Sequence, residues 1–351
     1  MTIRLRTLFF IALAALIIWF LYLERAILTP FILAAIFAYI FNPVVNFFTH
    51  KIKLPRTLSI SIIYIVLIGA IVFLGVFFTR RIFEESSELS RFVPQAIKGA
   101  KSQINTLPDF LRPTALDGLA SLQKSRVFTP AYWVTLFPQA ISRLLSFFLF
   151  LVAGFYFLKQ GNNIFDKILN LIPRDLRIDT EIMLRRMNMV FARYLRGQVF
   201  LIIFVSVALF IPLSILGVKF ALILAIFSGF AEIVPIFGPI FAGTVAALVA
   251  LISGTANFPV TPIQGAIIVA AIYFVVRMLE DYFVIPHVMG KVTDLHPLII
   301  LFAVIAGGHL WGILGLVLAV PIAGAIKILL NFSLDRINRT HLANKKAPGK
   351  Q

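Results

Sequence analysis

The sequence contains no cysteine, which excludes disulfide bonds, thiolate-bound metals and catalysis by a cysteine nucleophile. Charged residues are also scarce: Asp, Glu, Lys and Arg together form 13% of the 351 residues, whereas hydrophobic residues form 60%. A chain of this composition has too few polar side chains to cover the surface of a large water-soluble domain. The composition therefore predicts a protein that lies mostly within a membrane.

Several motifs of enzymes and of ligand-binding proteins are missing as well. The glycines lie in apolar sequence with no following Lys-Ser or Lys-Thr, so no phosphate-binding loop is present. The carboxylate–histidine motif of zinc hydrolases does not occur, and His287 and His296 lack the spacing of two metal ligands on one helix. An intramembrane protease would need paired aspartates or a serine–histidine pair in its spans, and the sequence has neither. We therefore expect no enzyme activity, no cofactor and no metal site.

The net charge of +17 does not indicate a nucleic-acid partner. Nucleic-acid binding would need a basic soluble module, whereas the longest non-membrane segments here are mixed in sign. Lys and Arg gather at the cytoplasmic ends of spans in bacterial membrane proteins. We expect these charges to face the lipid bilayer surface.

Continuous apolar runs are the main feature that the sequence does have. Six of them approach or exceed the roughly 18 residues that mark a spanning helix. They are Leu8–Leu23, Leu28–Phe48, Leu58–Phe78, Pro138–Leu158, Val199–Leu216 and Ile263–Val276. The runs do not alternate between apolar and polar residues, so barrel strands are not expected. With two longer stretches, they predict an all-α polytopic membrane protein with six to eight transmembrane helices.

The two longer stretches, Lys219–Ile252 and Pro297–Leu330, are each apolar over 34 residues and are each interrupted by proline and glycine. A straight helix of that length extends about 51 Å, whereas the hydrocarbon core of a bilayer is about 30 Å thick. Each stretch must therefore tilt strongly, break, or return as a re-entrant hairpin; single crossings give eight spans in all, and hairpins give six. The uncharged connection Ser253–Pro262 favours an outside position, and hence the hairpins. Paired interrupted segments are typical of a transporter's substrate site.

Charged residues between the spans indicate how the chain is arranged. Arg4 and Arg6 place the N-terminus in the cytoplasm, and the basic tail places the C-terminus there as well. The predicted organisation is three spans in residues 1–79, an extracytoplasmic and mostly helical segment in 80–137, a fourth span in 138–158, a cytoplasmic amphipathic segment in 159–197, a transport core in 198–330 and a basic tail in 331–351.

The first break contains Glu232, Pro235, Gly238 and Pro239. The two prolines stop an α-helix, because proline has no N–H to donate and its ring clashes with the preceding turn. Glu232 lies about 20 Å along a helix from Lys219, and an ionisable group at that depth is by default a functional hypothesis. It is a candidate for a proton or cation site, or for a substrate contact. Alternatively, it is a structural carboxylate that accepts from loose N–H groups.

The second break contains Gly307, Gly308, His309 and Gly312. The four-residue spacing of Gly308 and Gly312 predicts a close approach of two backbones, with helix packing alone as the simpler interpretation. His309 is a candidate for proton exchange and equally for capping the break. We expect these residues to face the first break across the substrate site.

A further polar group lies between the breaks and contains Arg277, Glu280, Asp281 and His296. Arg277 and Asp281 are four residues apart and are expected to pair on one face of a helix. The group is either a gate or coupling-ion site, or an anchor at the membrane boundary with a local ion pair. The sequence leaves both interpretations open.

Four stretches carry a family resemblance: Tyr194–Gln198 (YLRGQ), Glu232–Ile240 (EIVPIFGPI), Asp281–Gly290 (DYFVIPHVMG) and Asp294–Leu329. They resemble the autoinducer-2 exporter family of bacterial membrane proteins, the AI-2E transporters. The resemblance implies a multi-span permease of the bacterial inner membrane with cytoplasmic termini, discontinuous helices and a homo-oligomeric assembly such as a pentamer. Members of this family are associated with export of the quorum signal autoinducer-2, and some with sodium/proton exchange.

Three functions follow as hypotheses. The first is a secondary transporter that exports a small polar molecule, with substrate near Glu232 and a coupling proton or substrate contact at its carboxyl group. The second is a sodium/proton antiporter with Glu232, Glu280 and Asp281 as ion ligands. The third is a scaffold or regulator that does not transport and acts through Arg80–Phe137.

Overall fold

The protein is described by a computed structural model. It covers residues 23–73, 144–170, 174–288 and 295–345, together with Leu16, Trp19, Val76 and Ile172. Within these ranges every regular element is a helix, and five helices are long and apolar enough to cross a membrane. This confirms the all-helical, multi-span class. The predicted segment Arg80–Phe137 and most of the run Leu8–Leu23 lie outside the described residues.

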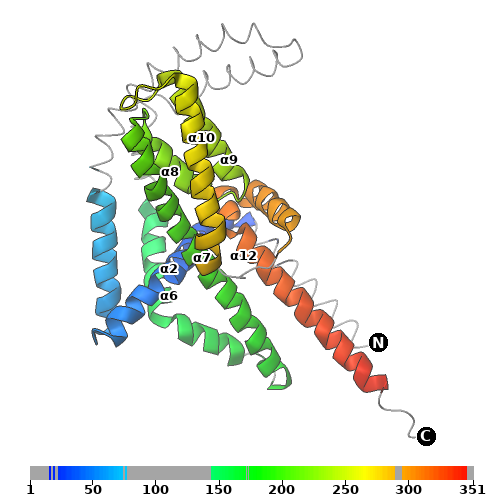
Figure 1. The fold of residues 1–351 in the computed structure, drawn as a ribbon. Coiled ribbons are helices and arrows are strands. Elements are labelled where there is room, and N and C mark those ends of the chain that lie inside the picture. The colour runs from blue at the N-terminus through cyan, green and yellow to red at the C-terminus, as the bar shows by residue number, and fades with distance from the viewer. Residues whose placement is uncertain are drawn as a thin grey trace, which may run out of the picture.

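The predicted apolar runs that the structure describes lie largely in helices, and several of these helices extend beyond the runs. Figure 1 shows how the helices are arranged. They are α2 (Arg25–His50), the helix Arg56–Phe73, α6 (Leu144–Asn170), α7 (Arg174–Leu216), α8 (Ala221–Ala231), α9 (Phe237–Ser253), α10 (Pro262–Leu279), the π-helical turn η2 (Glu280–Val284), α11 (Ile285–Val288) and α12 (Pro297–Lys345). The helix α6 packs on α2, while α7 contacts α2, α8, α10 and α12. The helix α7 is therefore the central element of the described residues.

The helix α7 contains two segments that the sequence analysis assigns to different parts of the protein. The amphipathic stretch 179–197 and the apolar run Val199–Leu216 form one helix of 43 residues. Its proline, Pro212, comes only in the last turns, so nothing earlier in the helix removes a backbone N–H. A helix of this length extends about 64 Å. Because this exceeds the hydrocarbon thickness, the arginine-rich first part must project beyond the apolar layer.

The first long stretch folds back on itself at the predicted break. The helix α8 ends at Ala231 and α9 begins at Phe237, so five residues form the turn between them. Ile236 in this turn has a positive φ of 72°. At the other end, Val218 before α8 bridges to Thr255 after α9. The two helices therefore form an antiparallel hairpin, and at 11 and 17 residues both are shorter than a full crossing.

The second long stretch also breaks, and glycine backbones on the two sides of the break come into contact. The helix α12 leaves helical geometry at Trp311 and at Gly312, which has φ 59° and ψ −137°. The chain reverses there, and the backbones of Gly307 and Gly315 touch, since a Cβ on either would meet the other's carbonyl oxygen. Two backbones therefore do approach closely at this break, through Gly307 and Gly315. Gly312 supplies the positive φ that the reversal requires.

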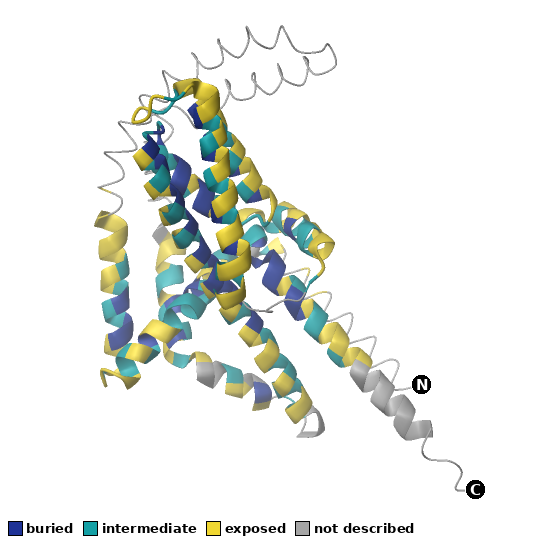
Figure 2. Cartoon of the chain, viewed as in Figure 1, coloured by how far each residue is buried: buried dark blue, intermediate teal, exposed yellow. Residues whose placement is uncertain are grey.

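Three apolar clusters hold the helices together, and one of them joins the two breaks. This cluster contains Tyr194 and Leu195 of α7, Val304 and Leu318 from the two halves of α12, and Val234 from the turn after α8. The buried residues lie along α7, α8 and the upper part of α12, while exposed residues cover the outward side of α10 (Figure 2). The turn of the first hairpin therefore packs beside the second break.

We expect Gly315→Ala to destabilise the protein, because the new methyl group would overlap the carbonyl oxygen of Gly307. Overpacking of this kind costs about 1–3 kcal/mol. Thermal unfolding in detergent would measure the effect. Gly69→Ala is the matched control, because a Cβ at Gly69 meets nothing within 4 Å. Equal melting temperatures for the two variants would contradict the close contact.

Candidate functional site

Four charged side chains from two distant parts of the chain meet where the first hairpin reaches α10. The guanidinium group of Arg277 donates to Asp281 through Nε and Nη2, at 3.0 and 2.8 Å. Its Nη1 lies 3.2 Å from the Glu280 carboxyl group and 3.5 Å from that of Glu232. One arginine therefore contacts three carboxyl groups.

Helix geometry explains three of the four positions. Arg277 precedes Glu280 and Asp281 by three and four residues, so the three side chains lie on one side of the helix. The helix changes from α to π geometry at Glu280, and π-helical turns are frequent at functional sites. The fourth residue, Glu232, enters from the turn between α8 and α9. The cluster thus forms only when the hairpin packs against α10.

Burial and charge set the chemistry of this cluster. The side chains of Glu232 and Glu280 are 5% and 2% exposed, whereas those of Arg277 and Asp281 are 31% and 45% exposed. No donor among the described residues reaches Oε1 of Glu280. Three carboxyl groups face one guanidinium group, so the ionised cluster would carry two surplus negative charges. It is therefore suited to hold a proton, or to contact a positively charged or hydrogen-bond-donating ligand.

Gln198 of α7 fixes the turn that carries Glu232. Its side-chain Nε2 donates to the Glu232 backbone oxygen at 3.0 Å, and the residue is buried. A helix leaves its last carbonyl groups without partners in the helix, so this bond satisfies one of them at the end of α8. We did not assign a role to Gln198 from the sequence. An uncharged amide at the start of an apolar run was the signal that could have found it.

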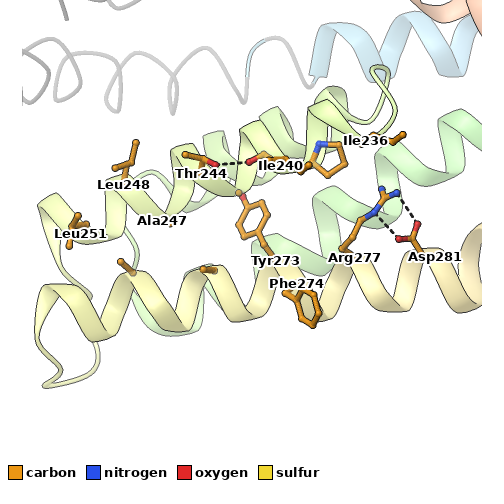
Figure 3. Close-up of a pocket in the computed structure, with 14 residues that line it drawn as sticks. Ile236, Ile240, Thr244, Ala247, Leu248, Leu251, Tyr273, Phe274, Arg277 and Asp281 are labelled. Carbon is orange, nitrogen blue, oxygen red and sulfur yellow. Dashed lines mark hydrogen bonds and ion pairs between the residues drawn. The ribbon is translucent and has the colours of Figure 1, made fainter. Parts of the chain in front are cut away.

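A groove of about 730 Å³ runs between α9 and α10 and ends at the charged cluster (Figure 3). Its lining is Ile236, Pro239, Ile240, Gly243, Thr244, Ala247, Leu248, Leu251, Ala266, Ala270, Tyr273, Phe274, Arg277 and Asp281. Small residues from both helices, such as Gly243 and Ala270, leave the space open. The groove is thus apolar along its length, with the Arg277–Asp281 ion pair at one end.

The residues predicted at the first break lie in three places: the charged cluster, the groove lining and the turn itself. Glu232 joins the charged cluster, and Pro239 lines the groove. Pro235 lies within the turn, and Gly238 packs so closely on the Ala231 carbonyl group that a side chain would overlap it. These residues therefore shape the turn, the groove and the charged cluster together.

The other predicted residues belong to α12 or immediately precede it. Gly307, Gly308 and Gly312 belong to the break in α12, and His309 is exposed just before it. The Nδ1 atom of His296 accepts from the Leu298 N–H at 3.3 Å, at the first turn of α12. Neither histidine is among the ion-pair partners of Arg277.

A metal site is not formed by the ranges that the structure describes. Within them, no group of three or more His, Asp or Glu side chains is arranged to hold a metal ion. The carboxyl groups of the cluster form ion pairs with the guanidinium group of Arg277.

Broken apolar helices, with an ionisable cluster where a break meets a spanning helix, define a class of multi-pass membrane transport proteins. The comparison with protein families agrees with this class. The family model described as "AI-2E family transporter" matches residues 8–335, which is nearly the whole chain. The chain therefore belongs to the AI-2E transporter family, as the sequence resemblance predicted.

The similar curated proteins are named as transport proteins and permeases. "Putative transport protein YueF" of Bacillus subtilis is 30% identical over 85% of this chain and 82% of its own length. "Putative transport protein YrrI" of the same organism is 29% identical over 87% and 86%. "Putative permease PerM" of Escherichia coli K12 is 25% identical over 87% of each chain. These relatives support a role in membrane transport.

We expect Arg277→Met to destabilise the protein more than Asp281→Asn does. The first variant leaves two buried carboxyl groups without their cation, which costs about 3 kcal/mol. The second removes a half-exposed partner, for which about 1 kcal/mol or less is typical. Thermal unfolding in detergent would show a decrease of several degrees for Arg277→Met. Equal, small decreases would mean that the cluster is not held by Arg277.

Proposed function

We propose that this protein is a secondary transporter that exports a small polar molecule, of the autoinducer-2 type, across the bacterial inner membrane. The observation that carries the proposal is the cluster of Glu232, Arg277, Glu280 and Asp281 at the first break. A buried, unevenly charged group in an apolar layer is expensive, and such groups mark substrate and proton paths. The family and the named relatives support transport, while substrate and direction belong to the proposal.

In this proposal both long stretches are re-entrant. The α8–α9 hairpin enters from outside, and its turn reaches the depth of Arg277. The break in α12 belongs to a hairpin that enters from the cytoplasm, and Val234 in the first turn packs against α12. Opposed hairpins of this kind match the inverted arrangement of many transporters. Both termini then lie in the cytoplasm, and the homo-oligomeric state follows from the family resemblance.

In this proposal the side chains of the charged cluster have different roles. Substrate would lie at the charged end of the groove, where Arg277 and Asp281 are partly exposed. Glu232 is buried beside them and would carry a coupling proton or accept a hydrogen bond from substrate. Because Glu232 is bonded through Arg277 to Asp281, a charge change at one carboxyl group alters the pairing of the others.

Sodium/proton exchange is the second candidate, and the surplus of carboxyl groups in the cluster favours it. Against it, the described residues contain no His, Asp or Glu group with metal-binding geometry. The scaffold hypothesis depends on Arg80–Phe137, which lies outside the described residues. The exporter therefore remains the first proposal.

Flux in proteoliposomes tests the role of Glu232. We expect wild-type protein to release autoinducer-2 at a rate that an imposed pH gradient alters. Glu232→Gln should reduce this rate about tenfold or more and abolish its response to the gradient, because the amide cannot exchange a proton. Glu181→Gln is the matched control, since among the described residues Glu181 pairs with Arg185 near the start of α7 and not with the charged cluster.

Two outcomes would contradict the exporter. Sodium-dependent proton movement without release of autoinducer-2 would favour the antiporter. No flux of either kind, in protein shown to be folded and oriented, would favour another substrate or the scaffold hypothesis.

The groove is tested by filling it. Ala270 lines the groove and is exposed, so Ala270→Phe places a ring in the open space without disturbing a packed contact. We expect transport to fall several-fold while the melting temperature changes by no more than about 2 °C. The neighbour Ala271 is also exposed but is not part of the lining. Equal transport by Ala270→Phe and Ala271→Phe would show that substrate does not use this groove.

A further inference from the structure

Two side chains of the stretch YLRGQ on α7 donate hydrogen bonds to backbone carbonyl groups, one in α2 and one in the turn after α8. Arg196 donates through Nε to the Tyr39 backbone oxygen of α2 at 2.8 Å. Two residues later, Gln198 donates to the Glu232 backbone oxygen at 3.0 Å. These side chains point to nearly opposite sides of the helix, because each residue turns the helix by about 100°. One turn of α7 thus contacts both α2 and the charged hairpin turn.

The Tyr39 carbonyl group needs a partner because of Pro43. In an α-helix the N–H of residue 43 would donate to the carbonyl group of residue 39, and proline has no N–H. Arg196 supplies the missing donor. The same tyrosine is held by two further residues of α7: its hydroxyl donates to the Asn188 side chain at 2.7 Å, and its ring stacks on Phe191. The proline-containing part of α2 is therefore fastened to α7.

The Glu232 carbonyl group needs a partner because α8 ends there. Gln198 is buried, so its loss would leave a buried acceptor unpaired. In an apolar layer that is costly, since water does not replace the missing bond. The position of α7 therefore sets where the Glu232 turn lies relative to Arg277.

We infer that α7 couples the position of α2 around Pro43 to the geometry of the charged cluster, with Arg196 and Gln198 as the positioning residues. A shift of α7 that follows movement of α2 displaces Gln198 from the turn, and the reverse holds as well. The coupling rests on these contacts alone. Its consequence, that movement of α2 changes access to Glu232, rests on the proposed transport function.

Hydrogen–deuterium exchange of the full chain in lipid nanodiscs tests the coupling without measuring flux. Among the described residues, the hydrogen bond that Arg196→Met removes is the one to α2. We expect this variant to accelerate exchange of amides in the turn after α8, across α7 from the change, by about two- to fivefold. Gln198→Leu should accelerate exchange at the turn by about three- to tenfold, as expected for loss of one hydrogen bond. It should also accelerate exchange around Tyr39.

Two controls separate coupling from general loosening. Asn42→Ala removes an α2 contact with Arg56 beside the same proline, and should leave exchange at the turn unchanged. Arg196→Lys keeps a donor that reaches the Tyr39 carbonyl group, and should restore most of the protection. Faster exchange in α2 alone after Arg196→Met would overturn the inference. Equal acceleration of the turn by Asn42→Ala would overturn it as well. If the exchange results are as expected but the proteoliposomes show no transport, the proposed function is rejected and the coupling still stands.

Discussion

Hydrogen bonding of interrupted backbone is the constraint on which this structure depends. A helix that stops inside an apolar layer leaves carbonyl and N–H groups that water does not reach, and each needs a partner from the protein. Here α7 supplies donors on both sides, to Tyr39 beside the proline of α2 and to Glu232 at the end of α8. A long helix is suited to this task because no proline interrupts its backbone bonds before Pro212. The central place of α7 among the described helices follows from that role as much as from its apolar contacts.

The hairpin that leaves a backbone carbonyl group without a helical donor also brings the charged side chains together. Glu232 follows the last residue of α8, so the turn that frees its carbonyl group also places its carboxyl group beside Arg277. One arginine then contacts three carboxyl groups, two of them buried, and this arrangement is stable only if positive charge is shared closely among them. A site of this kind responds strongly to one added proton or one bound cation. That sensitivity is what a coupled transporter needs and what a purely structural ion pair does not need.

Much of this could be predicted from the sequence, because it depends on local rules. The length of each long apolar stretch, with proline and glycine inside it, predicts a break, and the spacing of Arg277 and Asp281 predicts their pairing. The antiporter hypothesis groups Glu232 with Glu280 and Asp281, but no local rule supports their approach, because 45 residues separate Glu232 from Arg277 and packing of α9 on α10 brings them together. For the same reason, the sequence predicts a close approach of two backbones at the second break but not that Gly307 and Gly315 make it. The position of this contact depends on where the chain reverses, which is at Trp311 and Gly312. The role of Gln198 was missed because a single amide carries no periodic signal.

The two breaks are held by different interactions. The first is fixed by a directed hydrogen bond from Gln198 and by the ion pair with Arg277. The second is held by contact between two glycine backbones and by apolar packing around Leu318. A hydrogen bond and an ion pair depend on the distance and the direction of their partners, whereas apolar packing depends on contact alone. Val234 of the first turn packs in the same apolar cluster as α12, so the two breaks share one core although different interactions hold them.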